Sequence, residues 1–314
     1  MNTSQDLVPL GKTDIMITTV GVGTWAWGDR LIWGYGGSSF NDADIREAFD
    51  VSLQNGANWF DTAEVYGMGK SERFLGKFIP TTKKTVLVAT KFFPFPWRLR
   101  KAAMLRALRK SLKRLKISRV DLYQIHAPIG LWSKSAYVST LADAVTAGLT
   151  RAVGVSNFNT AKTKLVNESL LAAGVPLSSN QVEYSLFDRH IEKNGLLDYC
   201  LENEITVIAY SPLAKGMVTG KYGPENPPPG PRKRMYPPDK LQQAQPLIRL
   251  LKKIGAEHGK TPAQVALNWT ICKGTVPIPG AKNAKQAAEN LGAMGWRLSR
   301  EEVLALDEAS NLLG

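Results

Sequence analysis

Four side chains that together could carry acid–base chemistry follow apolar or aromatic runs in the sequence. They are Asp61, Tyr66, Lys91 and His126, and each lies at or soon after the end of a run that predicts a β-strand. A tyrosine phenol has an ordinary pKa near ~10, so donating its proton to an oxygen at neutral pH needs neighbours that lower this value. A lysine ammonium is such a neighbour. These residue types therefore predict proton transfer at an oxygen atom.

Taken singly, these residues have ordinary structural explanations. Asp61 could cap a helix, Lys91 could be a solvated loop lysine, and Tyr66 could be a packing aromatic. In a parallel α/β barrel, however, the carboxyl ends of all strands meet at one end, where such barrels gather their catalytic groups. We therefore expect the four side chains to meet at the mouth of a barrel.

The segments FDTAEVYG, VATKF and YQIHAP, which contain these residues, resemble segments of aldo-keto reductases. The similarity covers essentially the whole chain and lies on the side of that superfamily with the potassium-channel β subunits and many bacterial and plant reductases. It implies a catalytic tetrad of Asp61, Tyr66, Lys91 and His126. In that tetrad Tyr66 donates a proton and Lys91, paired with Asp61, lowers the pKa of Tyr66. His126 orients or polarises a carbonyl group.

Strand and helix signals alternate along the chain. A hairpin is expected from residues 7–11 and 14–17, followed by strands at 19–23, 59–61, 85–90, 121–126, 152–156, 180–184, 206–210 and 275–277. Helices are expected at 42–54, 101–115, 135–147, 160–173, 192–203, 242–257 and 284–293, with two more beginning at 262 and 299. This alternation predicts a parallel sheet. We expect one α/β domain over residues 1–314: a (β/α)8 TIM barrel with an N-terminal hairpin and extra C-terminal helices.

The composition describes a globular protein. Of the 314 residues, 44% are hydrophobic and only 21% are charged, which excludes a disordered chain. Cys200 and Cys272 lack CxxC spacing, so neither a disulfide framework nor a metal site is expected. No apolar run approaches the ~18 residues of a membrane span, and the start lacks a signal-peptide pattern. We expect a cytoplasmic protein, or a plastid protein if a transit peptide has been removed.

The net charge of +13 has an ordinary structural explanation. Many cations crowd into residues 98–116, where leucines recur at helical spacing, so the charges are expected to form the solvated face of a barrel helix. We expect no nucleic-acid partner and no membrane partner. A basic surface also attracts a dinucleotide phosphate.

The cofactor implied by the resemblance is NADP(H). No GxGxxG follows an early strand, so a Rossmann domain is not supported. Instead, Ser156, Asn157 and Gln181 are expected to hold the nicotinamide carboxamide, and Tyr210 offers a ring on which the nicotinamide stacks. Without the family match, an ordinary turn would explain Ser156 and Asn157, and Tyr210 would be an aromatic residue at the end of a strand. The other contacts expected near the nicotinamide and pyrophosphate are Thr24, Trp25, Ser211, Leu213, Lys215 and Gly216.

The adenosine end is expected at residues 278–290. Gly280 precedes a predicted helix start, which suits a phosphate, and Lys282 lies where the resemblance places the 2′-phosphate. Gln286, Glu289 and Asn290 recur at spacings of three and four, so one helix face can present all three to adenine and ribose. A cation at Lys282, with no acidic residue there, favours NADP(H) over NAD(H).

The proline-rich stretch within residues 211–240 predicts a long stiffened loop above the barrel. We expect it to close over the pyrophosphate, with Lys221 and Arg232 as contacts. A plain surface loop is the alternative.

The resemblance implies an NADPH-dependent oxidoreductase that reduces a small-molecule aldehyde or ketone to an alcohol. Two alternatives stay open: an NADPH-binding regulatory subunit that senses redox state with slow turnover, and a barrel lyase or isomerase that uses Lys91 as a Schiff base. The substrate pocket is expected to be aromatic, with Trp25, Trp27, Trp33 and Trp97 as candidate walls; the alternative for some of these tryptophans is a place in the core.

Overall fold

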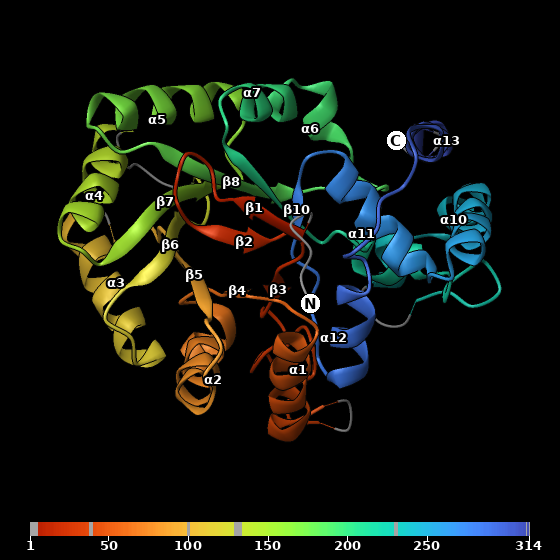
Figure 1. Ribbon diagram of the computed structural model, residues 1–314, viewed down its shortest axis with the longest axis horizontal. Helices are drawn as coiled ribbons and strands as arrows, with labels where there is room; N and C mark the ends of the chain where they lie inside the picture. Colours follow the sequence, from red (N-terminus) through yellow and green to blue (C-terminus); the bar gives the residue numbers. More distant parts are fainter. Residues whose placement is uncertain are drawn as a thin grey trace.

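The computed structural model describes residues 6–37, 40–98, 101–128, 134–228, 232–311 and 313. Eight parallel strands, hydrogen-bonded in chain order, curl around a common axis (Figure 1). They are β3 (Val22–Gly23), β4 (Trp59–Asp61), β5 (Leu87–Phe92), β6 (Val120–Ile125), β7 (Thr150–Ser156), β8 (Leu177–Glu183), β9 (Thr206–Tyr210) and β10 (Val276–Pro277). A parallel bridge between Gly23 and Gly280 joins the first strand to the last. The predicted (β/α)8 barrel is confirmed.

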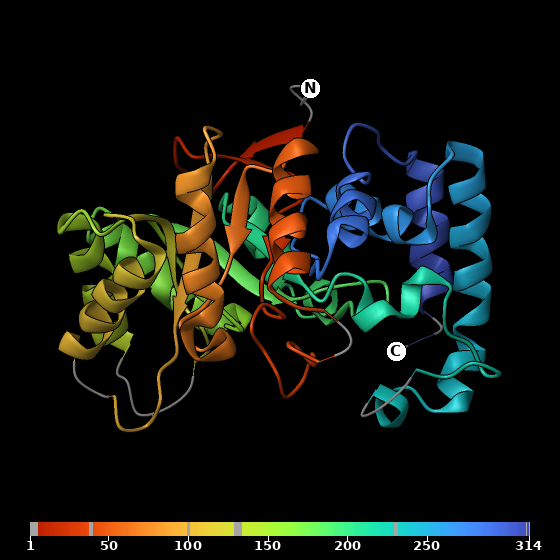
Figure 2. The same cartoon turned by 90° about the horizontal axis from the view of Figure 1, so that it is seen from below.

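An antiparallel hairpin of β1 (Leu7–Pro9) and β2 (Met16–Thr18) covers one end of the barrel, opposite the loops that follow β3 and β5 (Figure 2). Its Leu10, Ile15 and Ile17 are buried with apolar side chains from inside the barrel. Gly11 lies so near the Ser178 backbone that a Cβ would come within 2.6 Å of its carbonyl oxygen. The hairpin therefore plugs the end of the barrel away from the predicted site.

Helices surround the barrel. They are α1 (Asp42–Gln54), α2 (Lys70–Phe78), α3 (Lys101–Leu115), α4 (Lys134–Thr146), α5 (Thr160–Ala172), α6 (His190–Lys193), α7 (Leu196–Glu202), α8 (Arg232–Met235), α9 (Pro238–Gln243), α10 (Gln245–His258), α11 (Pro262–Cys272), α12 (Ala284–Leu291) and α13 (Arg300–Asn311). Three helix starts carry reciprocal side-chain caps, at Asn41, Thr261 and Ser299, because each side chain accepts from a backbone amide that the helix leaves unpaired. None of the described helices is long and apolar enough to cross a membrane.

Three elements differ from the sequence prediction. Helix α2 has no counterpart in the prediction, and its short nine-residue run contains Gly76 and the buried Glu72, which obscure the apolar pattern. The helix expected at 192–203 is two helices, because Gly195 adopts φ +73° between them. The stretch 211–240 is not a plain loop, since it contains the 3₁₀ segment η4 (Ala214–Thr219) and helices α8 and α9.

Two of the cations assigned to a solvated face are ion-paired instead. Arg114 binds Glu72, whose side chain is fully buried, with Nε to Oε2 at 2.5 Å. Arg98 binds Glu64 through two nitrogens at 2.6 and 3.2 Å. Sequence reasoning treated both arginines as surface charges because their partners lie 34 and 42 residues away.

Candidate active site

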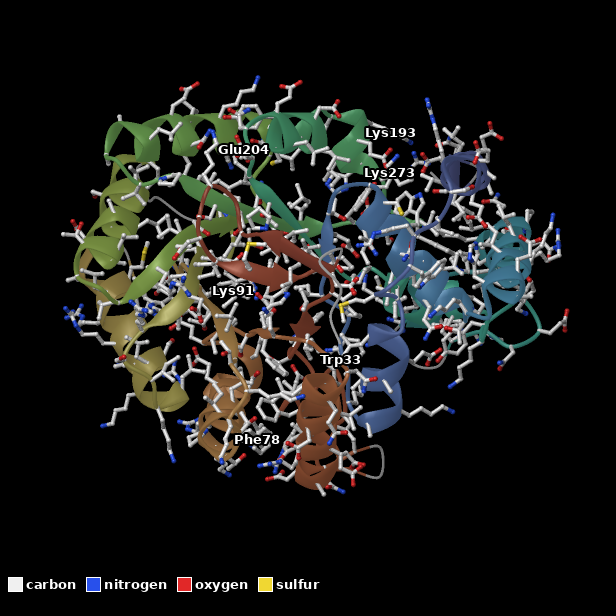
Figure 3. The ribbon with its side chains drawn as sticks, in the orientation of Figure 1. Trp33, Phe78, Lys91, Lys193, Glu204 and Lys273 are labelled. Atoms are coloured by element: carbon white, nitrogen blue, oxygen red, sulfur yellow. The ribbon has the colours of Figure 1, made fainter. Side chains whose placement is uncertain are left out.

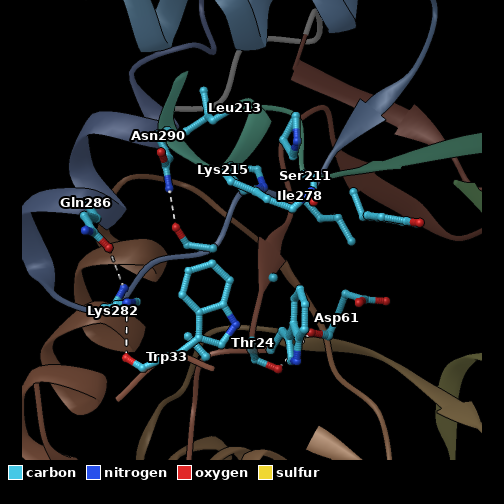
Figure 4. A pocket seen from close by; sticks show the side chains of 18 of the residues that line it. Thr24, Trp33, Asp61, Ser211, Leu213, Lys215, Ile278, Lys282, Gln286 and Asn290 are labelled. Atoms are coloured by element: carbon cyan, nitrogen blue, oxygen red, sulfur yellow. Dashed lines mark hydrogen bonds between the residues drawn. The ribbon is translucent and has the colours of Figure 1, made fainter. Parts of the chain in front are cut away.

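A cavity of about 990 Å³ opens at the carboxyl ends of the strands (Figure 4). It brings together nearly all of the predicted site residues. Those that line it are Thr24, Trp25, Asp61, Tyr66, His126, Ser156, Asn157, Gln181, Tyr210, Ser211, Leu213, Lys215, Gly216, Lys221, Gly280, Lys282, Gln286, Glu289 and Asn290. Lys91 lies behind this wall, and Arg232 begins α8 with its side chain outside the described part of the chain.

Lys91 is the centre of the predicted tetrad. Its side chain is fully buried inside the barrel (Figure 3). The ammonium donates to Asp61 Oδ1, to the Thr62 carbonyl oxygen at 3.0 Å and to Tyr66 Oη at 3.2 Å. Since an ammonium has three protons, all of its donors are used. The ammonium is thereby held against both the carboxylate and the phenol.

The second oxygen of the Asp61 carboxylate faces two amides. Gln181 donates to Oδ2 at 2.8 Å and Gln124 at 3.3 Å. Gln181 was predicted to meet a nicotinamide, and its amide nitrogen is bonded to this carboxylate. Gln124 was not predicted at all, although a buried glutamine two residues before His126 in a mostly apolar strand is a usable sequence signal.

The pKa of Tyr66 moves in the direction opposite to the sequence expectation. Burial raises the pKa above its ordinary value of 10.0, and the Lys91 charge acts in the lowering direction without cancelling burial. Burial would lower the pKa of Lys91, but Asp61 raises it above 10.5. At neutral pH the phenol is therefore protonated and the amine charged, which is the state that a proton donor needs.

His126 is neutral. Burial, and then the Lys91 charge, lower the pKa of its imidazole from 6.5 to about 3. The ring lies 5.6 Å from the Tyr66 ring, and its Nδ1 is buried without a hydrogen-bond partner among the described residues. A neutral imidazole carries one N–H, so at the cavity it can orient a polar group without adding charge.

The predicted nicotinamide contacts form a connected set. Asn157, at φ +62°, donates to the His126 carbonyl oxygen at 3.0 Å and accepts from Tyr210 Oη at 2.9 Å. Ser156 Oγ donates to the Gln181 carbonyl oxygen at 2.8 Å. These bonds fix the ends of β7, β8 and β9 relative to the end of β6.

The far end of the cavity is built on the start of α12. Lys282 Nζ lies 4.6 Å above the Trp33 ring and 3.4 Å from the Trp33 carbonyl oxygen, while its backbone N–H donates to Gln286. Asn290 donates to the Gly280 carbonyl oxygen at 3.2 Å (Figure 4). A cation is therefore held beside a helix N-terminus, where backbone amides favour an anion.

The segment after β9 turns sharply at the cavity. Ser211, Ala214 and Lys215 have positive φ angles of 51°, 47° and 55°. Lys215 Nζ binds Glu183 at 3.2 Å, so this cation is already paired. Conformations of this kind are unfavourable for residues other than glycine and gather at ligand sites.

The four tryptophans expected in the substrate pocket have three different locations. Trp25 and Trp33 line the cavity, with their rings 5.5 Å apart. Trp27 was expected in the pocket wall, but it is fully buried in the core and donates to the Ala281 carbonyl oxygen at 2.8 Å. Trp97 is 77% exposed and stacks on Phe95 outside the cavity lining.

A closed (β/α)8 barrel with a buried lysine, a phenol and a neutral imidazole at its mouth defines a class of barrel oxidoreductases. Residues 19–311 match the model of the aldo/keto reductase family. The chain therefore belongs to the aldo-keto reductase family.

Several known proteins resemble the chain over nearly its whole length. A chloroplastic pyridoxal reductase of Arabidopsis thaliana is 41% identical and covers 94% of this chain and 84% of its own. The aldo-keto reductase yakc [NADP(+)] of Schizosaccharomyces pombe is 32% identical, and the match covers 93% of this chain and 88% of the relative. Among solved structures, a Gluconobacter oxydans glycerol dehydrogenase superposes with a TM-score of 0.85 at 27% identity, covering 98% and 95%. A Klebsiella pneumoniae aldo/keto reductase in complex with NADP and acetate superposes with a TM-score of 0.77 at 28% sequence identity. The match covers 96% of this chain and 94% of the Klebsiella chain.

The lowered pKa of His126 predicts a specific pH dependence of stability. Between pH 6 and 4 the unfolded chain binds a proton at this residue and the folded chain does not, so the free energy of unfolding falls as pH falls. One such proton contributes a slope of about 1.4 kcal/mol per pH unit. We expect His126→Asn to remove this slope, as measured by urea unfolding at pH 6, 5 and 4. Parallel curves for the two proteins would show that His126 titrates normally.

Proposed function

We propose that the chain is an NADP(H)-dependent reductase of aldehydes or ketones, in which Tyr66 is the proton donor. The observation that carries this proposal is the contact of one buried ammonium, Lys91, with both Asp61 and the phenol. When bound, NADPH supplies a hydride to a carbonyl carbon. The residues of the chain then have one task, which is to handle the negative charge that develops on the carbonyl oxygen.

Tyr66 transfers its proton to that oxygen and becomes a phenolate. The phenolate is stabilised by the Lys91 ammonium at 3.2 Å, which is in place before the reaction starts. Asp61 keeps the ammonium charged and oriented. Neutral His126 orients the carbonyl group and, because it has no charge, does not compete with Lys91 for the phenolate.

The cavity residues fit an NADP(H) molecule. Tyr210 offers a ring beside Asn157, and Ser156 and Asn157 offer polar groups for a carboxamide. Lys282, at the start of α12, suits a 2′-phosphate because the half-buried cation lies against the Trp33 ring and carbonyl oxygen beside a helix N-terminus. The Schizosaccharomyces and Klebsiella relatives, named with NADP, support this assignment.

A chain of aromatic rings that begins at His126 and runs outside the cavity lining favours a substrate whose carbonyl group is attached to a planar aromatic ring. Ring contacts run outward from His126 to Phe93 at 5.5 Å, on to Phe95 at 4.5 Å, and then to Trp97 at 4.8 Å. Aromatic rings bind one another through stacked or edge-to-face contacts. We call Phe93, Phe95 and Trp97 the aromatic shelf. The pyridoxal reductase relative acts on an aldehyde of this kind by its name, which makes pyridoxal the first substrate to assay.

The aromatic shelf is fixed to the chain next to Tyr66 by one ion pair. Glu64 accepts from the Phe93 backbone N–H at 2.8 Å and from Arg98 at 2.6 Å, and Arg98 also donates to the Phe93 carbonyl oxygen at 3.1 Å. Glu64 lies two residues before Tyr66, so these bonds tie the aromatic shelf to the segment that carries the proton donor. Glu64 and Arg98 are positioning residues that the sequence reading did not identify.

A reducing compartment fits the cysteines. Cys200 and Cys272 are free, and burial raises the pKa of the Cys200 thiol to about 12. We propose the cytosol, with a plastid as the alternative suggested by the Arabidopsis relative. No feature of the described residues favours the regulatory-subunit alternative over turnover.

Replacing Tyr66 with phenylalanine tests the proposed function directly. We expect Tyr66→Phe to lower kcat for pyridoxal and benzaldehyde by about 10² to 10⁴, because general acid catalysis is typically worth that much. The dissociation constant for NADPH, measured by fluorescence titration, should stay within about twofold. A variant that keeps more than about a tenth of the wild-type kcat would exclude Tyr66 as the acid.

The choice of cofactor is tested at Lys282. We expect Lys282→Ala to weaken NADPH binding by about 1.5 to 3 kcal/mol, the usual contribution of a hydrogen bond to a charged group. NADH lacks the 2′-phosphate, so its affinity should barely change. Calorimetric titration of both cofactors makes the comparison, with Lys285→Ala, one turn along in the same cavity wall, as the matched control. Equal weakening of NADPH and NADH would place Lys282 on a part of the cofactor that they share.

The aromatic shelf is tested with two substrates. We expect the double variant Phe95→Ala, Trp97→Ala to lower kcat/KM for 2-naphthaldehyde by about 5- to 150-fold, mainly through KM, because aromatic contacts are worth about 0.5 to 1.5 kcal/mol each beyond the area they bury. Propanal should be reduced as before. Leu31→Ala, at a side chain that is 97% exposed, is the control. Equal losses for both aldehydes would mean that the shelf supports the fold and not the substrate.

A further inference from the structure

The charge of this chain is concentrated in one segment. Residues 70–119 contain sixteen of the forty Lys and Arg residues but only one of the twenty-seven Asp and Glu residues, Glu72. The segment therefore carries a formal net charge of +15, and the rest of the chain carries −2. The overall charge of +13 is thus a local property and not an average over the surface.

The fold places this segment on one side of the barrel, where α2 and α3 pack against each other (Figure 1). We call the exposed cations of the segment the basic face. They are Arg73, Lys77, Lys83, Lys84, Arg106, Arg109, Lys110, Lys113, Lys116 and Arg119. Glu72 cannot neutralise them because it is buried and binds Arg114. None of the ten forms an ion pair within the described part of the chain.

The partners of the basic face within the chain are neutral. Lys84 Nζ donates to the Leu53 carbonyl oxygen at 2.6 Å, and Lys77 Nζ lies 5.6 Å from the Phe74 ring centroid. Arg73 reaches the Met68 carbonyl oxygen at 3.4 Å. Such contacts leave the positive charge uncompensated, so the face attracts anions from solution.

The composition of the face selects among polyanionic partners. On α2 and α3, every exposed side chain that the structure describes is a cation except Ala102. Stable protein interfaces are depleted in lysine and enriched in aromatic residues, and single-stranded nucleic acids need aromatic rings for their bases. Membrane-surface helices add apolar side chains that enter the lipid. A duplex needs only cations at its phosphates.

The spacing along α3 also suits a phosphate backbone. Arg106, Lys110 and Lys113 follow one another at four and three residues, so they form a row on one side of the helix. With Lys116 just beyond the helix, the row extends about 15 Å at 1.5 Å per residue. One strand of a duplex presents four or five phosphates over that distance.

We propose that the basic face binds the phosphate backbone of double-stranded nucleic acid, independently of base sequence. DNA and RNA duplexes offer the same backbone charge, and the experiment below includes both. The face is separate from the cavity, because none of its ten cations lines it. The protein can therefore hold a duplex and turn over substrate at the same time, and this proposal does not depend on the proposed function.

The test is fluorescence anisotropy with labelled 20-base-pair DNA and RNA duplexes between 50 and 200 mM NaCl. Wild-type protein should bind at least one duplex with a log–log salt slope of about −4 or steeper. The variant Arg106→Gln, Lys110→Gln, Lys113→Gln, Lys116→Gln removes the row and should bind at least about tenfold more weakly at 50 mM NaCl, with the slope reduced by about 3.6, since each lost phosphate contact removes about 0.9. The duplex that binds more tightly, DNA or RNA, is the natural ligand that we assign to the basic face.

The control removes four exposed lysines elsewhere: Lys162→Gln, Lys164→Gln, Lys252→Gln, Lys253→Gln. It lowers the net charge equally and should keep the salt slope to within about 1. Both variants should keep the wild-type melting temperature. If the face variant fails to fold, Lys113→Gln, Lys116→Gln replaces it, with an expected slope change of about 2. The proposal is overturned by equal losses in face and control variants, by no duplex binding at 50 mM NaCl, or by tighter binding to phosphatidylserine vesicles than to either duplex.

Discussion

The buried ion pair of Lys91 and Asp61 is the interaction on which the site depends. Removing an ammonium and a carboxylate from water costs several kcal/mol per ion, and their attraction offsets that cost only if the remaining hydrogen bonds are satisfied. Here they are satisfied by the Thr62 carbonyl oxygen, the Tyr66 phenol and the amides of Gln124 and Gln181. The charge pair and these groups come from β4, β5, β6 and β8 and from the segment that follows β4, so the charge pair is tolerable only inside a closed barrel with the correct strand register.

The same ammonium modifies the effect of burial on the pKa values of its two neighbours. It stabilises the ionised form of Tyr66 against the effect of burial, and it adds to the effect of burial on His126, whose pKa falls to about 3. Burial therefore leaves a protonated phenol and a neutral imidazole at the mouth, while the fixed positive charge of Lys91 favours the phenolate that forms when Tyr66 gives up its proton. Only one cation then faces the oxygen on which negative charge develops, and it is held through the phenol.

The positions of residues at strand ends could be predicted from the sequence, because each of them depends on a single strand and not on a contact with a distant residue. Asp61 and His126 lie at or directly after the end of an apolar run, whereas Tyr66 lies five residues beyond its strand and was identified through the family resemblance. Features that depend on distant pairs were not predicted: Glu64 with Arg98 across 34 residues, and Gln124 with Asp61 across 63. Trp25 and Trp27 illustrate the same limit. They are two residues apart in one loop, yet one lines the cavity and the other bonds to Ala281, 254 residues away.

Internal pairing also explains why the outer surface near α2 and α3 is so basic. The acids in and just before this part of the chain are used inside the protein: Glu64 positions the aromatic shelf through Arg98, and Glu72 joins α2 to α3 through Arg114 while accepting from Thr90 at 2.7 Å. A buried carboxylate that holds an arginine cannot screen the charges outside it. These internal pairs thus consume the local negative charge, and the ten cations of the basic face have no ion-pair partner among the residues that the structure describes.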